Sequence, residues 1–160
     1  MSYDNIVKTM KMTGIDGESQ VDGASNEMDV LSFSFDAAIP MEGRGPGLSG
    51  SGAAYVSPVS VTKMVCGSTP KIEAQFYSGK PIGTVTLKDY KADGENSPKP
   101  FVVVTLTNAR IHTYHAEGTS EHLELTFEKI EREYFSQNTA TGALVSKGKT
   151  GFDVLTKKVS

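Results

Sequence analysis

The stretch from Glu121 to Phe135, EHLELTFEKIEREYF, decides the fold because two hydrophobic periods compete in it. A helix is favoured by apolar side chains that recur at spacings of four, three and four residues, at Leu123, Phe127, Ile130 and Tyr134. From Leu123 to Phe127, however, apolar and polar residues alternate, as in a half-buried strand. The alternation stops after Phe127, so a strand over the whole stretch needs a bulge near residues 128–129 or two buried faces.

The surrounding sequence favours strands. Residues 28–35 show the clearest alternation, with Leu31, Phe33 and Phe35 on one face together with Asp29. Further strands are predicted at 5–12, 59–63, 83–90, 101–108 and 110–116, with a turn-rich segment at 91–100. Because strands flank the EHLELTFEKIEREYF stretch, we interpret it as a strand too, against its weak local preference for a helix.

One helix is predicted, from Pro70 to Ser78. Thr69 suits the N-cap, Pro70 suits the first helical position, and Gly79 follows the predicted end. Ile72 and Phe76 are four residues apart and give the helix one buried face.

A long glycine-rich loop is predicted from Ile39 to Ser57. Its segment from Gly45 to Gly50 matches the G-x-G-x-x-G pattern of dinucleotide-binding proteins, which needs a helix directly after it. Pro58 and alternating valines follow instead, so the pattern does not indicate phosphate binding. A loop of this length inside a compact domain is functional or disordered, and we interpret it as flexible or ordered by a partner.

The reactive residues do not form a recognisable site. His112, His115 and His122 are candidate metal ligands together with Glu117 and Glu121. His112 and His115, however, are three apart and point to opposite faces of a strand, and no Cys lies nearby, so these residues do not predict a metal site. The single Cys66 excludes an internal disulfide, and we interpret it as a partly buried residue before the helix. A solvated loop without the spacing of a calcium site is predicted for the acidic residues Asp16, Glu18, Asp22, Glu27 and Asp29. We therefore predict no catalytic, cofactor-binding or metal site.

Length and charge place the chain among single-domain proteins. The 160 residues suit one domain, in which residues 136–160 form a polar C-terminal tail. The net charge of −3 and the absence of a basic run argue against nucleic acid as a partner. No apolar segment approaches the length of a membrane-spanning helix, and the start MSYDNIVKTM does not read as a signal peptide.

Several short segments occur in the order seen in one protein family. They are GIDGES at 14–19, MDVLSFSF at 28–35, VTK at 61–63, STP at 68–70, GKPI at 79–82, LELTFEKI at 123–130 and GFD at 151–153. With them, nearly the whole chain resembles the haemolysin-coregulated protein (Hcp) family, the tube proteins of type VI secretion systems. Cys66 departs from the acid, and Phe35 from the Trp, that many relatives have at these positions.

The resemblance implies a mainly β fold, a two-sheet antiparallel β-barrel with the one helix on its flank. It also implies a homohexameric ring that stacks into a hollow tube, with sheath proteins, a spike protein at the tip and effector cargo as partners. Such a protein is not an enzyme and carries no cofactor. It is assembled in the bacterial cytoplasm and leaves the cell when the sheath fires. The first alternative is a phage-like contractile tail-tube protein without a type VI system, and the second is a monomeric β-barrel enzyme or ligand carrier.

The glycine-rich loop is the predicted contact between rings. It is long and carries the charges of Glu42 and Arg44 near its tip. We hypothesise that the stacking residues are Glu42, Gly43, Arg44, Gly45 and Gly47.

Overall fold

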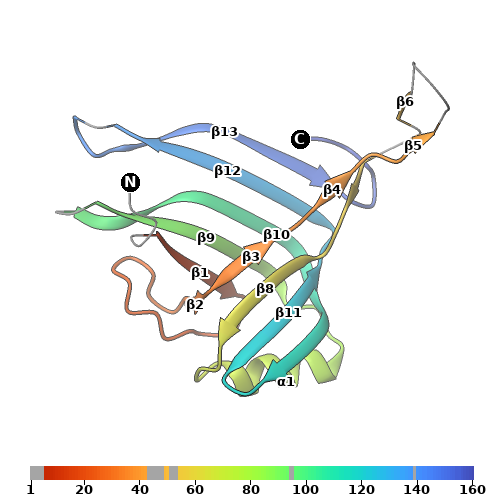
Figure 1. The fold of residues 1–160 in the computed structure, drawn as a ribbon, viewed down its shortest axis with the longest axis horizontal. Coiled ribbons are helices and arrows are strands. Elements are labelled where there is room, and N and C mark those ends of the chain that lie inside the picture. Colours follow the sequence, from red (N-terminus) through yellow and green to blue (C-terminus); the bar gives the residue numbers. More distant parts are fainter. Residues whose placement is uncertain (1–5, 43–48, 51–53, 94–95, 139) are drawn as a thin grey trace.

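Antiparallel strands make up most of the structure, as the alternating sequence segments predict (Figure 1). The computed structural model describes residues 6–42, 49–50, 54–93, 96–138 and 140–160. The strands are β1 (Ile6–Met12), β2 (Met28–Val30), β3 (Ser32–Ser34), β4 (Ala37–Ala38), β5 (Met41–Glu42), β6 (Ser49–Gly50), β7 (Tyr55–Val56), β8 (Val59–Met64), β9 (Gly83–Asp93), β10 (Asn96–Glu117), β11 (Ser120–Thr126), β12 (Lys129–Gln137) and β13 (Leu144–Asp153). The helix α1 (Thr69–Ser78) lies between β8 and β9 in the chain.

Two antiparallel sheets share the long strand β10. The first sheet has the order β2-β1-β9-β10-β12-β13, and the second has the order β10-β11-β8-β3. β10 pairs with β12 over residues 102–107 and with β11 over residues 110–117. Between these two regions its register with β9 shifts, and Asn108 takes a φ of 51°. Among the described residues the strand pairing does not close into a ring, so the predicted two-sheet barrel is confirmed in an open form (Figure 1).

The EHLELTFEKIEREYF stretch forms strands, as interpreted from its neighbours. It is two strands rather than one bulged strand, because β11 and β12 are separated at residues 127–128, where the Glu128 amide donates to the Thr107 carbonyl at 3.0 Å. Leu123 and Leu125 are buried on β11, and Ile130 is buried on β12. The two-residue break changes which alternate positions face the core, and this change produced the helix-like spacing of the apolar side chains.

Residues 28–35 are also two strands rather than one. Met28 and Val30 of β2 lie in the core, whereas Leu31 is 58% exposed. Phe33 and Phe35 then pack against the core from the second sheet. The predicted face with Leu31, Phe33 and Phe35 together is therefore wrong, because the chain leaves one sheet and enters the other at Leu31.

The helix is found where the sequence predicts it, with a different start. α1 includes Thr69, and Ser68 occupies the N-cap position without a side-chain capping bond. Ser68 Oγ donates instead to the Asp16 carbonyl at 2.7 Å. Gly79 ends the helix in the left-handed region with a φ of 68°, as predicted, and Ile72 is fully buried.

Two segments that the sequence predicts as irregular belong to strands. Of the turn-rich segment 91–100, residues 91–93 belong to β9 and residues 96–100 to β10, and these two strands pair with each other. Within the predicted polar tail at 136–160, residues 144–153 form β13, which pairs with β12. A strand at the edge of a sheet needs little apolar character, so its sequence does not show the hydrophobic alternation of a half-buried strand.

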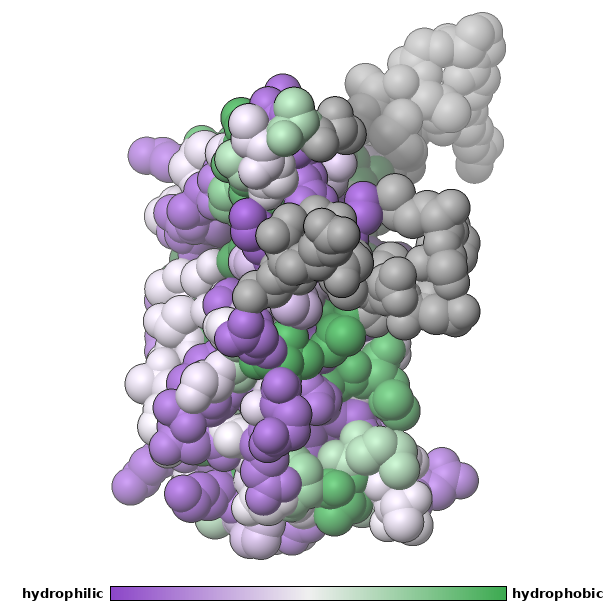
Figure 2. Space-filling view, turned by 90° about the vertical axis from the view of Figure 1, so that its left-hand side faces the viewer, coloured by the Kyte–Doolittle hydropathy of each residue, from purple (hydrophilic) through white to green (hydrophobic). Residues whose placement is uncertain are grey.

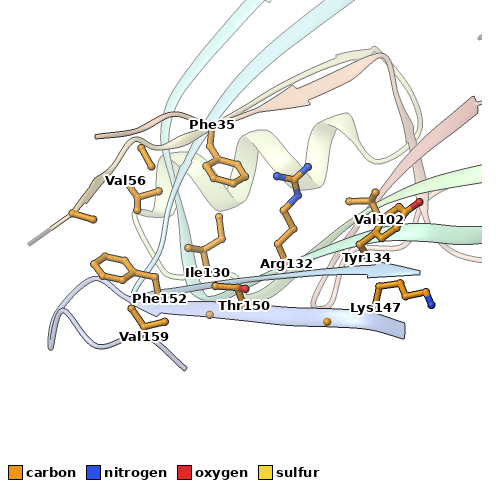
Figure 3. A pocket seen from close by; sticks show the side chains of 14 residues that line it. Phe35, Val56, Val102, Ile130, Arg132, Tyr134, Lys147, Thr150, Phe152 and Val159 are labelled. Carbon is orange, nitrogen blue, oxygen red and sulfur yellow. The ribbon is translucent and has the colours of Figure 1, made fainter. Parts of the chain in front are cut away.

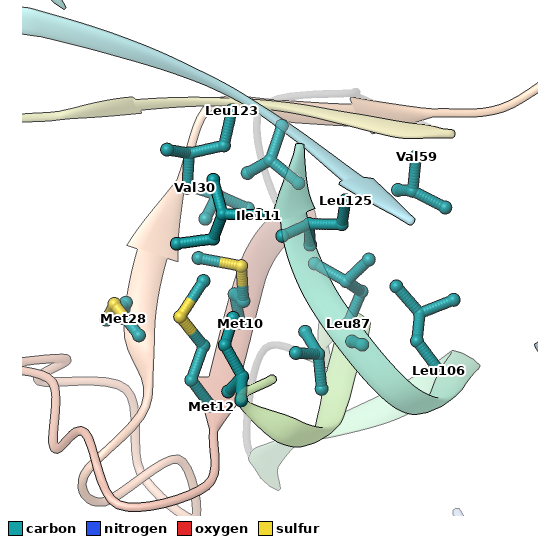
Figure 4. Packing of buried hydrophobic residues seen from close by; sticks show 14 of the residues in the cluster. Met10, Met12, Met28, Val30, Val59, Leu87, Leu106, Ile111, Leu123 and Leu125 are labelled. Atoms are coloured by element: carbon teal, nitrogen blue, oxygen red, sulfur yellow. The ribbon is translucent and has the colours of Figure 1, made fainter. Parts of the chain in front are cut away.

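The hydrophobic core lies between the two sheets and under α1. Figure 4 shows methionine and aliphatic side chains from both sheets pointing toward one another. Met10, Met12 and Leu87 come from the first sheet, and Leu123 and Leu125 from the second. All five are inaccessible to solvent. Interdigitation of this kind makes a rigid scaffold for the surfaces outside it.

A buried carboxylate ties the segment between β1 and β2 to the first sheet. Glu27 is 5% exposed and accepts hydrogen bonds from Thr9 Oγ1 at 3.1 Å, Tyr90 OH at 2.8 Å and Lys88 Nζ at 2.8 Å. Burial and the Glu27 carboxylate raise the pKa of Tyr90, which keeps its hydroxyl protonated as a donor. The sequence prediction of Glu27 as a solvated loop residue is therefore wrong.

A second buried charge cluster ties α1 to the second sheet. Lys63 Nζ lies 2.6 Å from Glu121 Oε2, and both side chains are inaccessible to solvent. The Tyr114 hydroxyl shares its one proton between the carboxylates of Glu121, at 2.8 Å, and Glu73 of α1, at 3.1 Å. Burial acts to raise the pKa of Glu121, but hydrogen bonds from Lys63, Thr69 and Tyr114 outweigh it and hold that pKa below its usual value.

Candidate assembly surfaces

The reactive residues named in the sequence analysis stay apart in the structure. Cys66 is a free, partly buried thiol before α1, as predicted. His122 shares a hydrogen bond with Thr62 at 3.1 Å, and His115 lies 3.8 Å from the carboxylate of Glu117 at the surface. In the described part of the chain, no three His, Cys, Asp or Glu side chains gather as metal ligands would.

A projecting hairpin carries the predicted stacking loop. β4 pairs with β7 and β5 pairs with β6, so the chain leaves the sheets, extends outward and returns (Figure 1). Where it is described, this segment has strands of its own, which corrects the prediction of an irregular loop. Of the predicted stacking residues, Glu42 is described only as a backbone position of β5, paired with Ser49. The others, Gly43, Arg44, Gly45 and Gly47, lie outside the described residues, as does most of the G-x-G-x-x-G segment.

The strand β13 has one partner and therefore a free edge. The C-terminal segment covers part of this edge, because Ser160 and Gly151 exchange backbone hydrogen bonds of 2.9 and 3.0 Å. The amide of Asp153 also donates to the carbonyl of Lys158 at 2.9 Å. Residues 144–150 have no strand partner on that side among the described residues. An uncovered strand edge is a surface on which another chain can pair.

A groove of about 680 Å³ lies between the β12–β13 hairpin and the strands β4 and β7. Its walls are mainly apolar and include Phe35, Val56, Ile130, Phe152 and Val159 (Figure 3). Arg132 points from β12 toward Phe35 across the groove, and Lys147 of β13 lies at the rim. Both basic side chains are exposed, and within the described ranges neither has a hydrogen-bonded or ion-paired partner. We call this surface, with Arg132 and Lys147, the basic groove.

A second apolar surface lies where β8 ends and β2 passes into β3. Leu31, Met64 and Val65 are 58%, 47% and 48% exposed there, beside a cleft of about 300 Å³. Glu18 and Asp29 line the same cleft, and their carboxylates have no partner in the described part of the chain. Figure 2 looks at this side of the molecule and shows hydrophobic surface gathered beside hydrophilic groups. We call these five residues the acidic patch.

Sequence reasoning missed both surfaces. Each joins residues from segments far apart in the chain, and strand pairing alone brings them together. The one local signal is Met64-Val65, two apolar residues in succession at the end of the alternating strand β8.

The architecture defines the class of protein: a mainly β, two-sheet antiparallel protein with a flanking helix and a projecting hairpin. In the part of the chain that the structure describes, no helix has both the length and the apolar character needed to cross a bilayer. A family model described as "Type VI secretion system effector, Hcp" matches residues 9–134, which is well over half of the chain. The chain therefore belongs to the Hcp family of type VI secretion proteins.

Solved structures with the same fold include other members of this family. A protein described as a type six secretion system protein has a TM-score of 0.83 and 24% identity, over 97% of this chain and 99% of that one. Hcp1 from Salmonella typhimurium has a TM-score of 0.72 and 24% identity, over 98% and 99%. A type VI secretion system effector from Yersinia pestis has a TM-score of 0.68 and 21% identity, over 92% and 99%. No curated relative was found by sequence comparison.

Proposed function

We propose that the chain is the structural tube subunit of a type VI secretion system. Six copies form a ring, and rings stack into a hollow tube that sheath contraction expels. The sheath proteins, a spike protein at the tip and small effectors in the lumen are its partners. It acts as a scaffold and not as an enzyme. The observation that carries this proposal is the family match over residues 9–134, together with a fold shared with Hcp structures over nearly the whole chain.

The physical character of the chain supports this role. A tube subunit must hold its shape under load, and a core packed from two sheets with buried charge clusters resists deformation. It must also bind copies of itself, and the free edge of β13, the basic groove and the acidic patch offer surfaces for that.

The oligomeric state tests the proposal directly. Native mass spectrometry of the purified protein should give a mass of six subunits, and negative-stain images should show annular particles. A monomer at high protein concentration would contradict the role of tube subunit and leave the fold unaffected.

Stacking between rings is a separate part of the proposal. The projecting hairpin is suited to reach a neighbouring ring, and its stacking residues are proposed to be Glu42, Gly43, Arg44, Gly45 and Gly47. Deleting residues 42–52 should leave the hexameric mass unchanged and abolish tubes in negative-stain images. Tubes as long as those of the wild-type protein would show that the hairpin is not the stacking contact.

A further inference from the structure

The basic groove and the acidic patch are complementary in two respects. Both expose apolar side chains, so both lose unfavourable contact with water when covered. The groove adds the positive charges of Arg132 and Lys147, and the patch adds the negative charges of Glu18 and Asp29. Paired surfaces of opposite charge recognise each other more selectively than apolar surfaces alone.

Within the described chain, the charged side chains of both surfaces have no ion-pair partner. Asp89 lines a neighbouring cleft with Arg132, but its carboxylate already accepts from Lys8 Nζ at 2.6 Å. Among the described residues that line the cleft of the acidic patch there is no lysine or arginine. Each surface therefore presents charges that an incoming partner can pair with, without first breaking an internal ion pair.

The two surfaces lie at opposite ends of the same strand. Val56, three residues before the start of β8 at Val59, lines the groove, and Val65, directly after β8, lines the patch. The six residues of β8 between them span about 20 Å at roughly 3.3 Å per residue. One copy can therefore offer its groove to one neighbour and its patch to another at the same time.

Symmetry then decides the kind of contact. A two-fold contact centred on one of the surfaces would place Arg132 against Arg132 or Asp29 against Asp29, which is repulsive. A two-fold dimer that pairs groove with patch twice uses both surfaces of both copies and cannot add further copies through them. A head-to-tail contact instead places groove against patch, and repetition of such a contact gives a ring when the rotation closes.

We propose that the acidic patch of one copy of this chain seats in the basic groove of the next. The contact pairs Arg132 and Lys147 with Glu18 and Asp29 of the neighbouring copy, around the apolar side chains Leu31, Met64 and Val65. This inference rests on the proposed function, which requires self-association, and adds the surfaces that carry it.

Charge exchange between two variants tests the contact. The groove variant carries Arg132→Glu and Lys147→Glu, and the patch variant carries Glu18→Lys and Asp29→Lys. Each variant alone opposes like charges at every contact and should give monomers in native mass spectrometry. An equimolar mixture restores opposite charges at every contact, so assemblies with equal numbers of both variants should form.

A matched control separates this contact from a general effect of charge. The control chain carries Arg110→Glu and Glu117→Lys, two exposed positions of β10 outside both surfaces, and should assemble as the wild type does. Circular dichroism and thermal melting check that all variants are folded. Assembly of either variant alone, or folded variants that stay monomeric when mixed, overturns the inference. With a hexameric wild-type protein, those outcomes leave the proposed function intact, whereas a monomeric wild-type protein overturns both.

Discussion

Lys63 and Glu121 form a buried ion pair, which matters for stability mainly because neither charge is left without its partner. Removing two charges from water costs several kcal/mol for each ion, so a buried pair adds little net stability compared with apolar residues. Here the Met64 carbonyl also accepts a hydrogen bond from Lys63 at 2.9 Å. The Tyr114 hydroxyl donates to the second carboxylate oxygen of Glu121. Because Tyr114 also binds Glu73, the cluster fixes the position of α1 on the second sheet.

Breaking this pair on one side should be costly. Lys63→Met leaves the Glu121 carboxylate buried without its cation, and we expect the free energy of unfolding to fall by about 3–5 kcal/mol. Urea denaturation at one fixed protein concentration measures the change, since association also contributes to apparent stability.

The same substitution at the surface provides the control. Lys149 lies 2.6 Å from Glu131, the same separation as in the buried pair, but its side chain is 54% exposed. Lys149→Met should therefore change the unfolding midpoint far less than Lys63→Met. Equal shifts for the two variants would show that burial does not determine the cost.

The same cluster predicts how stability depends on pH. The pKa of Glu121 in the folded protein lies below its ordinary value of 4.5, so the folded state holds fewer protons there than the unfolded chain. The contribution of the Glu121 carboxylate to stability is present above pH 4.5 and is lost as the pH falls through the pKa of Glu121 in the folded protein. The wild-type protein should lose stability in this acid range, and Glu121→Gln should show a shallower loss in denaturation curves. Parallel curves for the two proteins would contradict this assignment.

Tyr114 predicts how the stability of the protein changes at alkaline pH. Burial and the carboxylates of Glu121 and Glu73 raise the pKa of Tyr114 above its ordinary value of 10.0. Its contribution to stability is present below pH 10.0 and is lost as the pH rises toward the folded pKa. The Tyr114→Phe variant should therefore lose less stability than the wild-type protein as the pH rises past 10.0. Denaturation midpoints of both proteins, measured on both sides of pH 10.0, test this.

The environment of some individual residues could be predicted from the sequence, and that of others could not. Ile72 and Gly79 were predictable, because helix burial and helix termination follow local spacing and backbone preference. Glu27 and Glu121 were not, because a carboxylate in an acidic or alternating segment looks solvated until its distant donors are known. The partners of Glu27 lie up to 63 residues away, so only the folded chain brings them together.

At the scale of elements, Glu27 holds the whole segment between β1 and β2 against the first sheet. Glu27→Ala removes the acceptor of three donors, two of them buried, and should lower the free energy of unfolding by at least about 2 kcal/mol. Hydrogen exchange of residues 13–27 should also become faster, because the segment loses its attachment.

Glu18 gives the matched control, since it lies in the same segment and its carboxylate is exposed and unpaired within the described chain. Because Glu18 also lies in the proposed contact between copies, the comparison is made below the protein concentration at which rings form. Under that condition Glu18→Ala should leave both the unfolding free energy and the exchange of residues 13–27 near wild-type values. If Glu27→Ala behaves like Glu18→Ala, the segment is held by its backbone contacts instead.

The positions at which strands break could not be predicted from the sequence. The sequence predicted the strand identity of residues 28–35 and 121–135, but each is two strands, divided at Leu31 and at residues 127–128. Both breaks change which alternate positions face the core, so a single periodicity cannot describe either segment. At Leu31 the chain changes partner from β1 to β8. At residues 127–128 it keeps β10 as a partner on one side and changes from β8 to β13 on the other. Partners are a property of the sheet and not of the segment.

At the scale of the whole molecule, the fold could be recognised from ordered motifs, whereas the assembly surfaces could not. The motifs lie along the chain, but the groove combines residues 35, 56, 132, 147 and 152, which only the sheet order brings together. The predicted stacking residues illustrate the converse: they were chosen from a local pattern, and four of the five lie outside the described residues.

The proposed head-to-tail contact makes the assembly sensitive to salt. Raising sodium chloride from about 0.1 M to about 1 M shortens the Debye length from about 10 Å to about 3 Å and screens charges at the edge of a contact. The concentration at which rings dissociate should therefore rise several-fold, measured by light scattering across a dilution series. A variant with Arg132→Gln and Lys147→Gln should dissociate more readily at low salt and respond less to added salt. The apolar side chains of the acidic patch still bind at high salt, so rings should persist at high protein concentration. The same salt dependence in both proteins would place the interacting charges elsewhere on the molecule.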